Sequence, residues 1–358
     1  MRAADFNYCL PPELIAQTPS SERDQSRLLV LCRENGEIVH RRFHDLPEYL
    51  RPNDVLVLNN SRVIPARLRG VKPNTGGQIE VLLVEENAIN DWWVMLRPGK
   101  RVRAGTKIIF FDHKGQATEI YATVLEKNEE GHCRLHFSGT PSIVESLGSL
   151  GETPLPPYIS RENSIVSADD RERYQTIFAR PQGSVAAPTA GLHFTEKLFD
   201  EIRALGVRVC FVTLHIGFGT FAAVKSEKLE EHIMHGERFR ISGATSDVIN
   251  EAKREHRRVI AVGTTSVRVL ESVSREHNGK LVECEGRTPI FIYPPFRFQI
   301  VDAMLTNFHL PQSTLLMLVS AFAAPGETRG RGLILSTYAE AIRERYRFYS
   351  FGDAMLIL

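Results

Sequence analysis

The sequence has few cysteines and no closely spaced pair of them. Its five cysteines are scattered through 358 residues, with an odd total and no CxxC motif; they are Cys9, Cys32, Cys133, Cys210 and Cys284. This pattern is typical of reduced thiols in the cytoplasm and argues against a disulfide framework. A chain of this length buries enough surface to fold without a disulfide or a metal.

Long apolar runs and an excess of one charge are also lacking. The longest apolar run, Leu315 to Ala324, is about half of what a membrane-crossing helix needs. The N-terminal segment carries Asp5 and has no signal-peptide core. A net charge of +1 excludes a globally basic nucleic-acid binder but allows a local basic face. We therefore expect a cytoplasmic protein that does not insert into membranes.

The first part of the chain is rich in strand signals. Two β-like runs, Ser26–Cys32 and Glu37–Phe43, flank the turn pair Asn35-Gly36 and predict a hairpin. Evenly spaced runs without intervening helices then predict a small closed β-barrel; they are Ala66–Lys72, Gln78–Glu85, Trp92–Leu96, Lys107–Phe111, Thr118–Leu125 and His132–Phe137.

After the proline-rich segment Pro154–Tyr158, helices and strands alternate. Helix signals at Thr195–Leu205, near Asp247–His256 and from Ser266 onward are interleaved with strand signals at Val207–Leu214 and Val259–Val262. Alternation of this kind predicts a mixed α/β domain. We expect a discontinuous α/β catalytic domain over residues 1–63 and 150–358, with an antiparallel β-barrel domain inserted at 64–149.

The segment Val259–Arg268, VIAVGTTSVR, joins a buried strand to a helix. Gly263 permits close backbone approach to a ligand, and Thr264, Thr265 or Ser266 can cap the helix, whose free N–H groups favour an anion. Arg268 can add a bidentate contact to a carboxylate or phosphate. A capped helix without a ligand fits the same pattern, and the lysine of a phosphate-binding Walker loop is missing.

Two glycine-containing loops each carry a histidine. GSVAAPTAGLHFT places His193 just before a helix, and TLHIGFGTF places His215 at the end of a strand. Compact loops at the mouth of an α/β sheet often line ligands. The glycines around Phe218 allow its ring to lie against a flat base, although simple packing explains Phe218 equally well. A lone histidine such as His193 is more often a structural residue than a catalyst.

Three polar groups interrupt the apolar stretch VDAMLTNFHLP: Asp302, Asn307 and His309. Buried polar groups need partners, so we expect these to bond to one another or to a ligand. Asn60 and Arg62 follow the strand Val55–Leu58 in the same way. Short basic stretches at Arg97–Arg103, Arg254–Arg258 and Arg343–Arg347 are either solvated faces or contacts to a phosphate backbone.

The segment EHIMHGE contains His232, His235 and Glu237. On a helix the two histidines would share a face, so a metal site is conceivable. The HExxH arrangement is absent, however, and polar pairing or acid–base use explains the segment better.

Taken together, these motifs resemble the S-adenosylmethionine:tRNA ribosyltransferase-isomerase family of queuosine biosynthesis. The resemblance covers nearly the whole chain in the right order and is strongest in two segments, GSVAAPTAGLHFT and LTNFHLPQSTLLMLVSAFA. Asn60 stands where the family commonly has aspartate, so we expect that side chain to bind rather than to transfer protons. The family is described as an α/β domain with a β-barrel insert, usually monomeric and without a required metal or cofactor.

The resemblance implies a transferase reaction. The ribosyl part of S-adenosylmethionine, a co-substrate, is transferred to 7-aminomethyl-7-deazaguanine at the wobble position of a tRNA and rearranged to epoxyqueuosine, with release of adenine and methionine. Such chemistry needs an acid, a base and a binder for the methionine carboxylate. Histidine titrates in the right range, so we expect proton transfer from His193, His215 and His235, with Glu237 as an orienting partner. Substrate binding is expected at Asn60, Arg62, Phe218, Gly263, Thr264, Thr265, Ser266, Arg268, Asp302, Asn307 and His309.

Two other classes remain open. One is a metal-dependent hydrolase that uses His232, His235 and Glu237. The other is a non-catalytic RNA-binding module built on the barrel.

Overall fold

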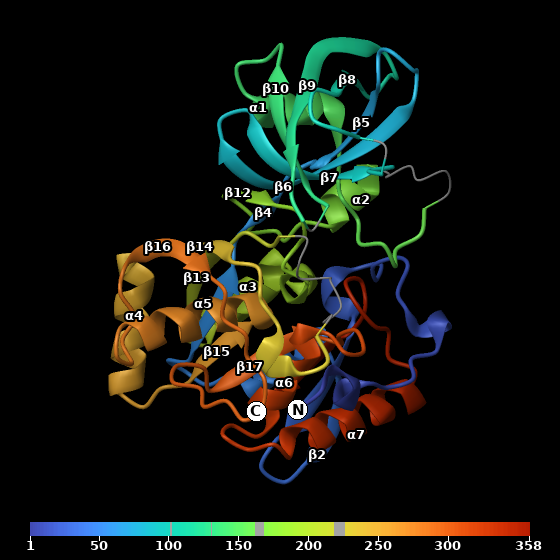
Figure 1. Ribbon diagram of the computed structural model, residues 1–358. Helices are drawn as coiled ribbons and strands as arrows, with labels where there is room; N and C mark the ends of the chain where they lie inside the picture. Colours follow the sequence, from blue (N-terminus) through green and yellow to red (C-terminus); the bar gives the residue numbers. More distant parts are fainter. Residues whose placement is uncertain (101, 130, 162–167, 218–225) are drawn as a thin grey trace.

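The computed structural model describes residues 1–358 except 101, 130, 162–167 and 218–225. Figure 1 shows two parts: an α/β domain that contains both termini, and a smaller all-β part that lies on one side of it. Within these described residues, no helix is both long and apolar enough to span a bilayer. The predicted α/β fold with an inserted barrel is confirmed.

The α/β domain is built on one large mixed sheet. Among the described residues it contains nine strands in the order β16–β14–β13–β3–β15–β17–β18–β1–β2. Its centre is parallel, because β3 pairs in parallel with both β13 and β15, and β15 pairs in parallel with β17. The strand bounds are β1 Arg27–Cys32, β2 Glu37–Arg42, β3 Val55–Asn59, β13 Arg208–Leu214, β14 Glu237–Ile241, β15 Val259–Val262, β16 Cys284–Thr288, β17 Ala303–Asn307 and β18 Ala354–Ile357.

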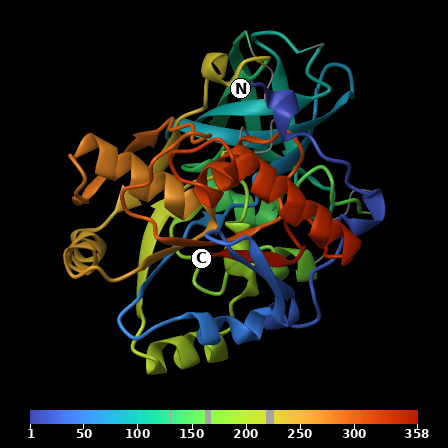
Figure 2. The same ribbon diagram turned by 90° about the horizontal axis from the view of Figure 1, so that it is seen from below.

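Helices cover both faces of this sheet, as Figure 2 shows. On one face α4, α5, α6 and α7 pack against alternate strand residues such as Val57 and Ala261. On the other face α3 and short 3₁₀ helices pack against the residues between them, such as Leu56 and Ile260. The central strands are therefore apolar on both faces, as expected for buried parallel strands. The helix bounds are α1 Ile143–Leu150, α2 Ala168–Arg173, α3 Glu196–Ala204, α4 Gly243–Arg254, α5 Gly263–Glu276, α6 Thr314–Ala323 and α7 Gly330–Arg343.

The all-β part is a closed antiparallel barrel with its own apolar core. Its strands follow the order β5–β6–β7–β10–β9–β8, and β8 pairs back onto β5 to close it. Each run predicted from the sequence forms one of these strands, which are β5 Arg67–Val71, β6 Gln78–Ala88, β7 Asp91–Arg97, β8 Lys107–Phe111, β9 Ala117–Lys127 and β10 Cys133–Ser138. Helix α1 packs on this core through Ile143, Leu147 and Leu150.

The insertion point places the barrel over one edge of the large sheet. The chain leaves the carboxyl end of β3, forms the short strand β4 (Arg62–Val63) and enters the barrel at Arg67. On its return it forms β12 (Gln182–Ser184), which pairs in parallel with β4. The short strand β11 (Gly151–Glu152) also adds to β5. The barrel therefore lies beside the carboxyl ends of the central strands.

Candidate functional site

Four parallel strands end at the same edge of the large sheet, and each delivers a polar residue there. Asn60 follows β3, His215 follows β13, Thr264 follows β15 and Asn307 ends β17. Ligands of open α/β sheets bind outside the carboxyl ends of the strands. The structure thus brings together, at one edge, residues that are widely separated in the sequence and that the sequence singled out.

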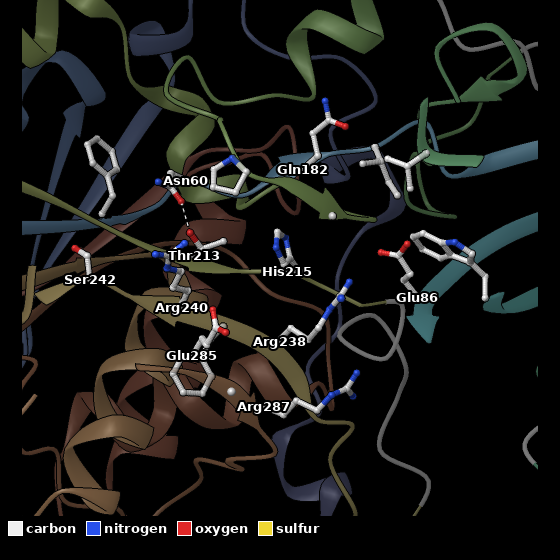
Figure 3. Close-up of a pocket in the computed structure, with 18 residues that line it drawn as sticks. Asn60, Glu86, Gln182, Thr213, His215, Arg238, Arg240, Ser242, Glu285 and Arg287 are labelled. Carbon is white, nitrogen blue, oxygen red and sulfur yellow. Dashed lines mark hydrogen bonds between the residues drawn. The ribbon is translucent and has the colours of Figure 1, made fainter. Parts of the chain in front are cut away.

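A cavity of about 810 Å³ lies between this edge and the barrel. Figure 3 shows Asn60, His215 and Arg238 around it, with Glu86 on the barrel side. A volume of this size accommodates a drug-sized or nucleotide-sized ligand. Within the site, Asn60 Oδ1 accepts a hydrogen bond of 2.7 Å from Thr213 Oγ1, which fixes the amide.

Three arginines line the same cavity: Arg238 and Arg240 from β14, and Arg287 from β16. Arg238 lies directly opposite Arg287 across the two strands, and like charges in that position repel each other unless an anion or acid lies nearby. Arg287 pairs with Glu85 of the barrel. Among the described residues, neither Arg238 nor Arg240 forms an ion pair with a carboxylate. This arginine wall, formed by Arg238, Arg240 and Arg287, is suited to binding an anion such as a phosphate.

His215 is held on the wall of the large cavity by close contacts. Its Nδ1 lies 2.8 Å from Oγ of the fully buried Ser61. A Cβ at Gly183 would lie 2.9 Å from the same ring atom, so only glycine lets this loop pass the imidazole. Burial, with a smaller contribution from Arg238, lowers the pKa of His215 to about 4. His215 is therefore neutral near pH 7 and able to accept a proton.

A second, smaller cavity of about 50 Å³ lies at the carboxyl ends of β15 and β17. Hydroxyl and amide groups line it beside aromatic rings, and Tyr158 Oη lies 2.7 Å from Ser350 Oγ at its border. Three motifs singled out in the sequence supply much of the lining, namely Pro188, Thr189, Gly263, Thr264, Thr265, Thr306, Asn307 and His309, and the C-terminal segment adds Tyr349 and Ser350. A backbone hydrogen bond of 3.0 Å from Val185 to Ile216 joins the two loops between the cavities.

His193 occupies a different setting from the one expected of a proton-transfer residue. It is buried, stacks on Phe43 with ring centroids 4.9 Å apart, and places Nδ1 2.7 Å from Ser26 Oγ. Its Nε2 accepts from Asn307 Nδ2 at 3.2 Å. Burial, with a smaller effect of Arg347, lowers its pKa to about 3. Because both ring nitrogens have internal partners, this position favours a structural role.

Asn307 and His309 lie at the predicted site, but Asp302 does not. His309 is buried, with Nε2 2.8 Å from Thr306 Oγ1, and burial lowers its pKa to about 3. Asp302 precedes β17 and so lies at the opposite, amino edge of the parallel strands, where it binds Lys253 at 2.8 Å. The expectation that Asp302 belongs to the same polar cluster is wrong, because the length of β17 separates it from Asn307.

Glu237 and Arg268 bind each other in the core. Both side chains are buried, and Glu237 also accepts a hydrogen bond of 2.9 Å from the Gly217 amide. Arg268 additionally donates to the Thr288 carbonyl at 3.2 Å. The carboxylate expected to orient a histidine and the guanidinium expected to hold a substrate anion therefore bind each other instead.

The segment from His232 to His235 is not helical, so the two histidines do not share a helix face. His235 is exposed, and the His232 ring packs edge-on against Phe291 with centroids 5.2 Å apart. Over the described part of the chain, no group of three or more histidine, cysteine or acidic residues is arranged to hold a metal ion.

The turn after β15 differs from the sequence expectation. Helix α5 begins at Gly263 and not near Ser266, since Gly263 has a φ of +82° that lets the strand turn directly into the helix. Val262 occupies the cap position without a side-chain cap, so Thr264, Thr265 and Ser266 lie in the first turn. The expectation that one of the hydroxyls caps the helix is wrong; Ser266 Oγ instead donates to the Val262 carbonyl at 2.8 Å.

The remaining sequence candidates lie elsewhere or outside the description. Arg62 is exposed on β4. Within the basic stretches, Arg258 binds Asp54 and Arg343 binds Glu340, each at 2.5 Å, which satisfies these charges internally. Phe218 lies outside the described residues.

Sequence reasoning missed the arginine wall. Arg238 and Arg240 alternate along ERFRI, a spacing that places both side chains on one face of a strand. This alternation is the signal in the sequence that indicates the two arginines.

The fold is that of a mixed α/β protein with an inserted barrel, and a candidate ligand site lies between the main sheet and the barrel. A model of the family described as queuosine biosynthesis protein matches residues 3–357, and the chain belongs to this family. Similar proteins include S-adenosylmethionine:tRNA ribosyltransferase-isomerases from Staphylococcus haemolyticus, 48% identical over 360 residues, and from Carboxydothermus hydrogenoformans, 51% identical over 358 residues; each alignment covers 100% of both chains.

A solved structure agrees with these relatives. The crystal structure of S-adenosylmethionine tRNA ribosyltransferase from Thermotoga maritima is 39% identical, with a TM-score of 0.55, and covers 99% of this chain and 100% of that one.

Proposed function

We propose that this chain is an S-adenosylmethionine:tRNA ribosyltransferase-isomerase. It transfers the ribosyl part of S-adenosylmethionine to 7-aminomethyl-7-deazaguanine at the wobble position of a tRNA and isomerises it to epoxyqueuosine, releasing adenine and methionine. The observation that carries this conclusion is identity of 48% and 51% to two enzymes of that name over the whole length of both chains.

The two cavities suggest how the substrates divide the site. The large cavity has the volume for a nucleotide, and Arg238 and Arg240 on its wall are suited to the phosphates of tRNA. The first turn of α5, at Gly263 and Thr264, borders the smaller cavity and suits an anion, either the methionine carboxylate or a tRNA phosphate. His215 and Ile216 are adjacent in the chain but line different cavities, so the reacting carbons would lie near His215.

His215 is our candidate for the general base. The positive sulfonium acidifies the neighbouring 5′ methylene of the ribose, and neutral His215 removes a proton from it. The 5′ carbanion expels the ring oxygen from C4′, and this oxygen expels adenine from C1′ as it becomes an aldehyde; adenine takes up the proton held by His215. The aminomethyl nitrogen then adds to C4′ and loses a proton, and the regenerated 5′ carbanion closes the five-carbon ring on C1′. The resulting alkoxide displaces methionine from the 5′ carbon and forms the epoxide. When Nδ1–H donates to Ser61 Oγ, Nε2 keeps the lone pair that accepts the proton. This arrangement makes Ser61 a positioning residue.

We further propose that the enzyme acts in the cytoplasm as a monomer, without a metal or other cofactor. The sulfonium of the co-substrate supplies the activation that a metal would otherwise provide, and all five cysteines are free thiols, as in a reducing compartment. Full activity after treatment with a chelator, in a sample that sediments as one chain, would support this. Loss of activity on chelation that zinc restores would instead support the metal-dependent hydrolase.

The reaction is tested by supplying S-adenosylmethionine labelled in the ribose together with tRNA that carries 7-aminomethyl-7-deazaguanine. The label should enter the tRNA and appear in a modified nucleoside. The matched control is the same tRNA with guanine at the wobble position, which lacks the attacking amine and should stay unlabelled. Binding of precursor tRNA without label transfer would instead indicate the non-catalytic RNA-binding module.

A further inference from the structure

Two buried polar atoms at the smaller cavity have no hydrogen-bond partner among the residues that the structure describes. Thr265 is 5% exposed and Asn307 is 2% exposed. Within the described residues, neither Thr265 Oγ1 nor Asn307 Oδ1 has a hydrogen-bond partner, although both residues line the cavity. Because leaving such groups unpaired is costly, they are expected to have a partner in the working enzyme.

The two orphan atoms constrain the chemistry of that partner. The amide nitrogen of Asn307 already donates to Nε2 of His193 at 3.2 Å, which fixes Oδ1 as the free acceptor. An acceptor is satisfied only by a donor, such as an ammonium group. A phosphate diester offers only acceptor oxygens and cannot satisfy Asn307 Oδ1. The first turn of α5 alone would accept a carboxylate or a phosphate equally well, but Asn307 Oδ1 favours the carboxylate of a group that also carries a donor.

The same cavity also presents the amino-terminal end of α5. Helix α5 runs for 14 residues from Gly263, and its first N–H groups have no acceptor within the helix and favour negative charge. Arg268, the first cation of the helix, is bound to Glu237 in the core. A carboxylate at this position would therefore be held by backbone N–H groups rather than by an arginine.

An unpaired acceptor beside free backbone donors is complementary to a group that carries an ammonium and a carboxylate on one carbon. We infer that the small cavity binds the α-amino acid end of S-adenosylmethionine, with its ammonium on Asn307 Oδ1 and Thr265 Oγ1 and its carboxylate at the first turn of α5; this assignment rests on the proposed function. The cavity volume of about 50 Å³ equals the space of about three to five waters, which suits the few heavy atoms of such an end group. Adenosine and tRNA remain outside it.

The test compares S-adenosylmethionine with 5′-methylthioadenosine, a neutral thioether that lacks the amino acid end. Calorimetric titrations are made on the whole protein, alone and saturated with tRNA that has guanine at the wobble position and so permits no transfer. Thr265→Val removes the orphan hydroxyl while keeping the side-chain shape. Asn307 is left intact because its amide nitrogen also contacts His193 and two backbone carbonyls.

We expect Thr265→Val to raise the Kd of S-adenosylmethionine about ten- to hundredfold, the loss typical of a hydrogen bond to a charged group. The Kd of methylthioadenosine should stay within about twofold, Tm should not fall, and Thr265→Ser should restore tight binding. Thr176→Val is the matched control, since Thr176 is also buried, its hydroxyl has no partner within the described part of the chain, and it lines neither cavity.

Three results would overturn the inference. They are an unchanged affinity for S-adenosylmethionine in Thr265→Val, as expected if water alone occupies the cavity; an equal loss for both ligands; and an equal loss in Thr176→Val. Because these are binding measurements, they are independent of ribosyl transfer by the wild-type enzyme. Transfer without selective loss in Thr265→Val refutes the inference alone, whereas selective loss without transfer refutes the proposed reaction.

Discussion

The hydrogen bond between Ser61 and His215 allows the proposed role of His215 as the general base to be tested by a single substitution. Ser61→Ala removes the hydroxyl that lies 2.8 Å from His215 Nδ1 and leaves the ring in place. A buried polar group that loses its partner costs about 1–3 kcal/mol, or about a five- to 150-fold change in a rate. This cost destabilises the tautomer that is protonated on Nδ1, which is the one whose Nε2 can act as the base. We therefore expect kcat to fall by about this factor, with KM for S-adenosylmethionine within about twofold of wild type.

The assay is release of adenine under saturating S-adenosylmethionine and precursor tRNA. Ser246→Ala is the control, because Ser246 is a buried serine in α4 whose hydroxyl has no partner among the described residues; it should keep wild-type kcat. His215→Ala should lose about 10²–10⁴-fold, the usual cost of removing a positioned base. Wild-type kcat in Ser61→Ala, or an equal loss in Ser246→Ala, would refute the role given to this hydrogen bond.

Three further predictions concern stability and tRNA binding. His193 and His309 have pKa values lowered to about 3 by burial, so below about pH 6.5 the unfolded chain takes up protons that the folded protein does not. The contribution of these neutral histidines to the free energy of unfolding should be fully present at pH 7. The free energy of unfolding should then fall by about 1.4 kcal/mol per pH unit for each histidine as the pH drops towards 5. Urea titrations at several pH values check this, and a free energy of unfolding that does not change with pH would contradict it. Glu237→Gln should cost about 3–5 kcal/mol, because it leaves Arg268 buried without its counter-charge; an unchanged urea midpoint would show that the pair is unimportant for stability. Arg238→Ala should reduce the salt dependence of tRNA binding by about one phosphate contact, whereas the conservative Lys variant at the same position should keep it; equal slopes for wild type and the alanine variant would count against the arginine wall as a phosphate site.

The fold was predictable because its signals are local. The six runs of the barrel, separated by turns without helices, each form a strand, and the strand at Val259–Val262 lies where its apolar β-branched residues indicate. Among the elements that were predicted, the errors are confined to boundaries, but other elements, such as α7, β14 and β18, were not predicted. Helix α5 begins earlier than predicted because the φ of +82° at Gly263 makes a loop between strand and helix unnecessary, a conformation that the sequence allows but does not require.

The position of the candidate site could be predicted from the sequence, but the hydrogen-bond and ion-pair partners of its side chains could not. The polar residues Asn60, His215 and Asn307, which the sequence singled out, lie at one edge of the sheet because parallel strands bring their carboxyl ends together there. Asp302 comes just before β17, so chain direction alone places it at the amino end of that strand, opposite Asn307.

The roles of buried groups depended on contacts that no local pattern reveals. Ser26 lies 167 positions from His193, and Glu237 lies 31 positions from Arg268. Histidine, glutamate and arginine look alike in a sequence whether they face a ligand or each other. Elements distant in the sequence bury His193 and the Glu237–Arg268 ion pair, which favours structural roles for them, whereas His215 lies on the wall of the large cavity.

The central claim is tested most directly by measuring adenine release and ribosyl transfer in one reaction. Purified protein is incubated with ribose-labelled S-adenosylmethionine and tRNA that carries 7-aminomethyl-7-deazaguanine. We predict one adenine released for each labelled nucleoside formed in the tRNA, with neither product when guanine occupies the wobble position. Adenine release without labelled tRNA, or no release at all with intact precursor tRNA, would contradict the assignment.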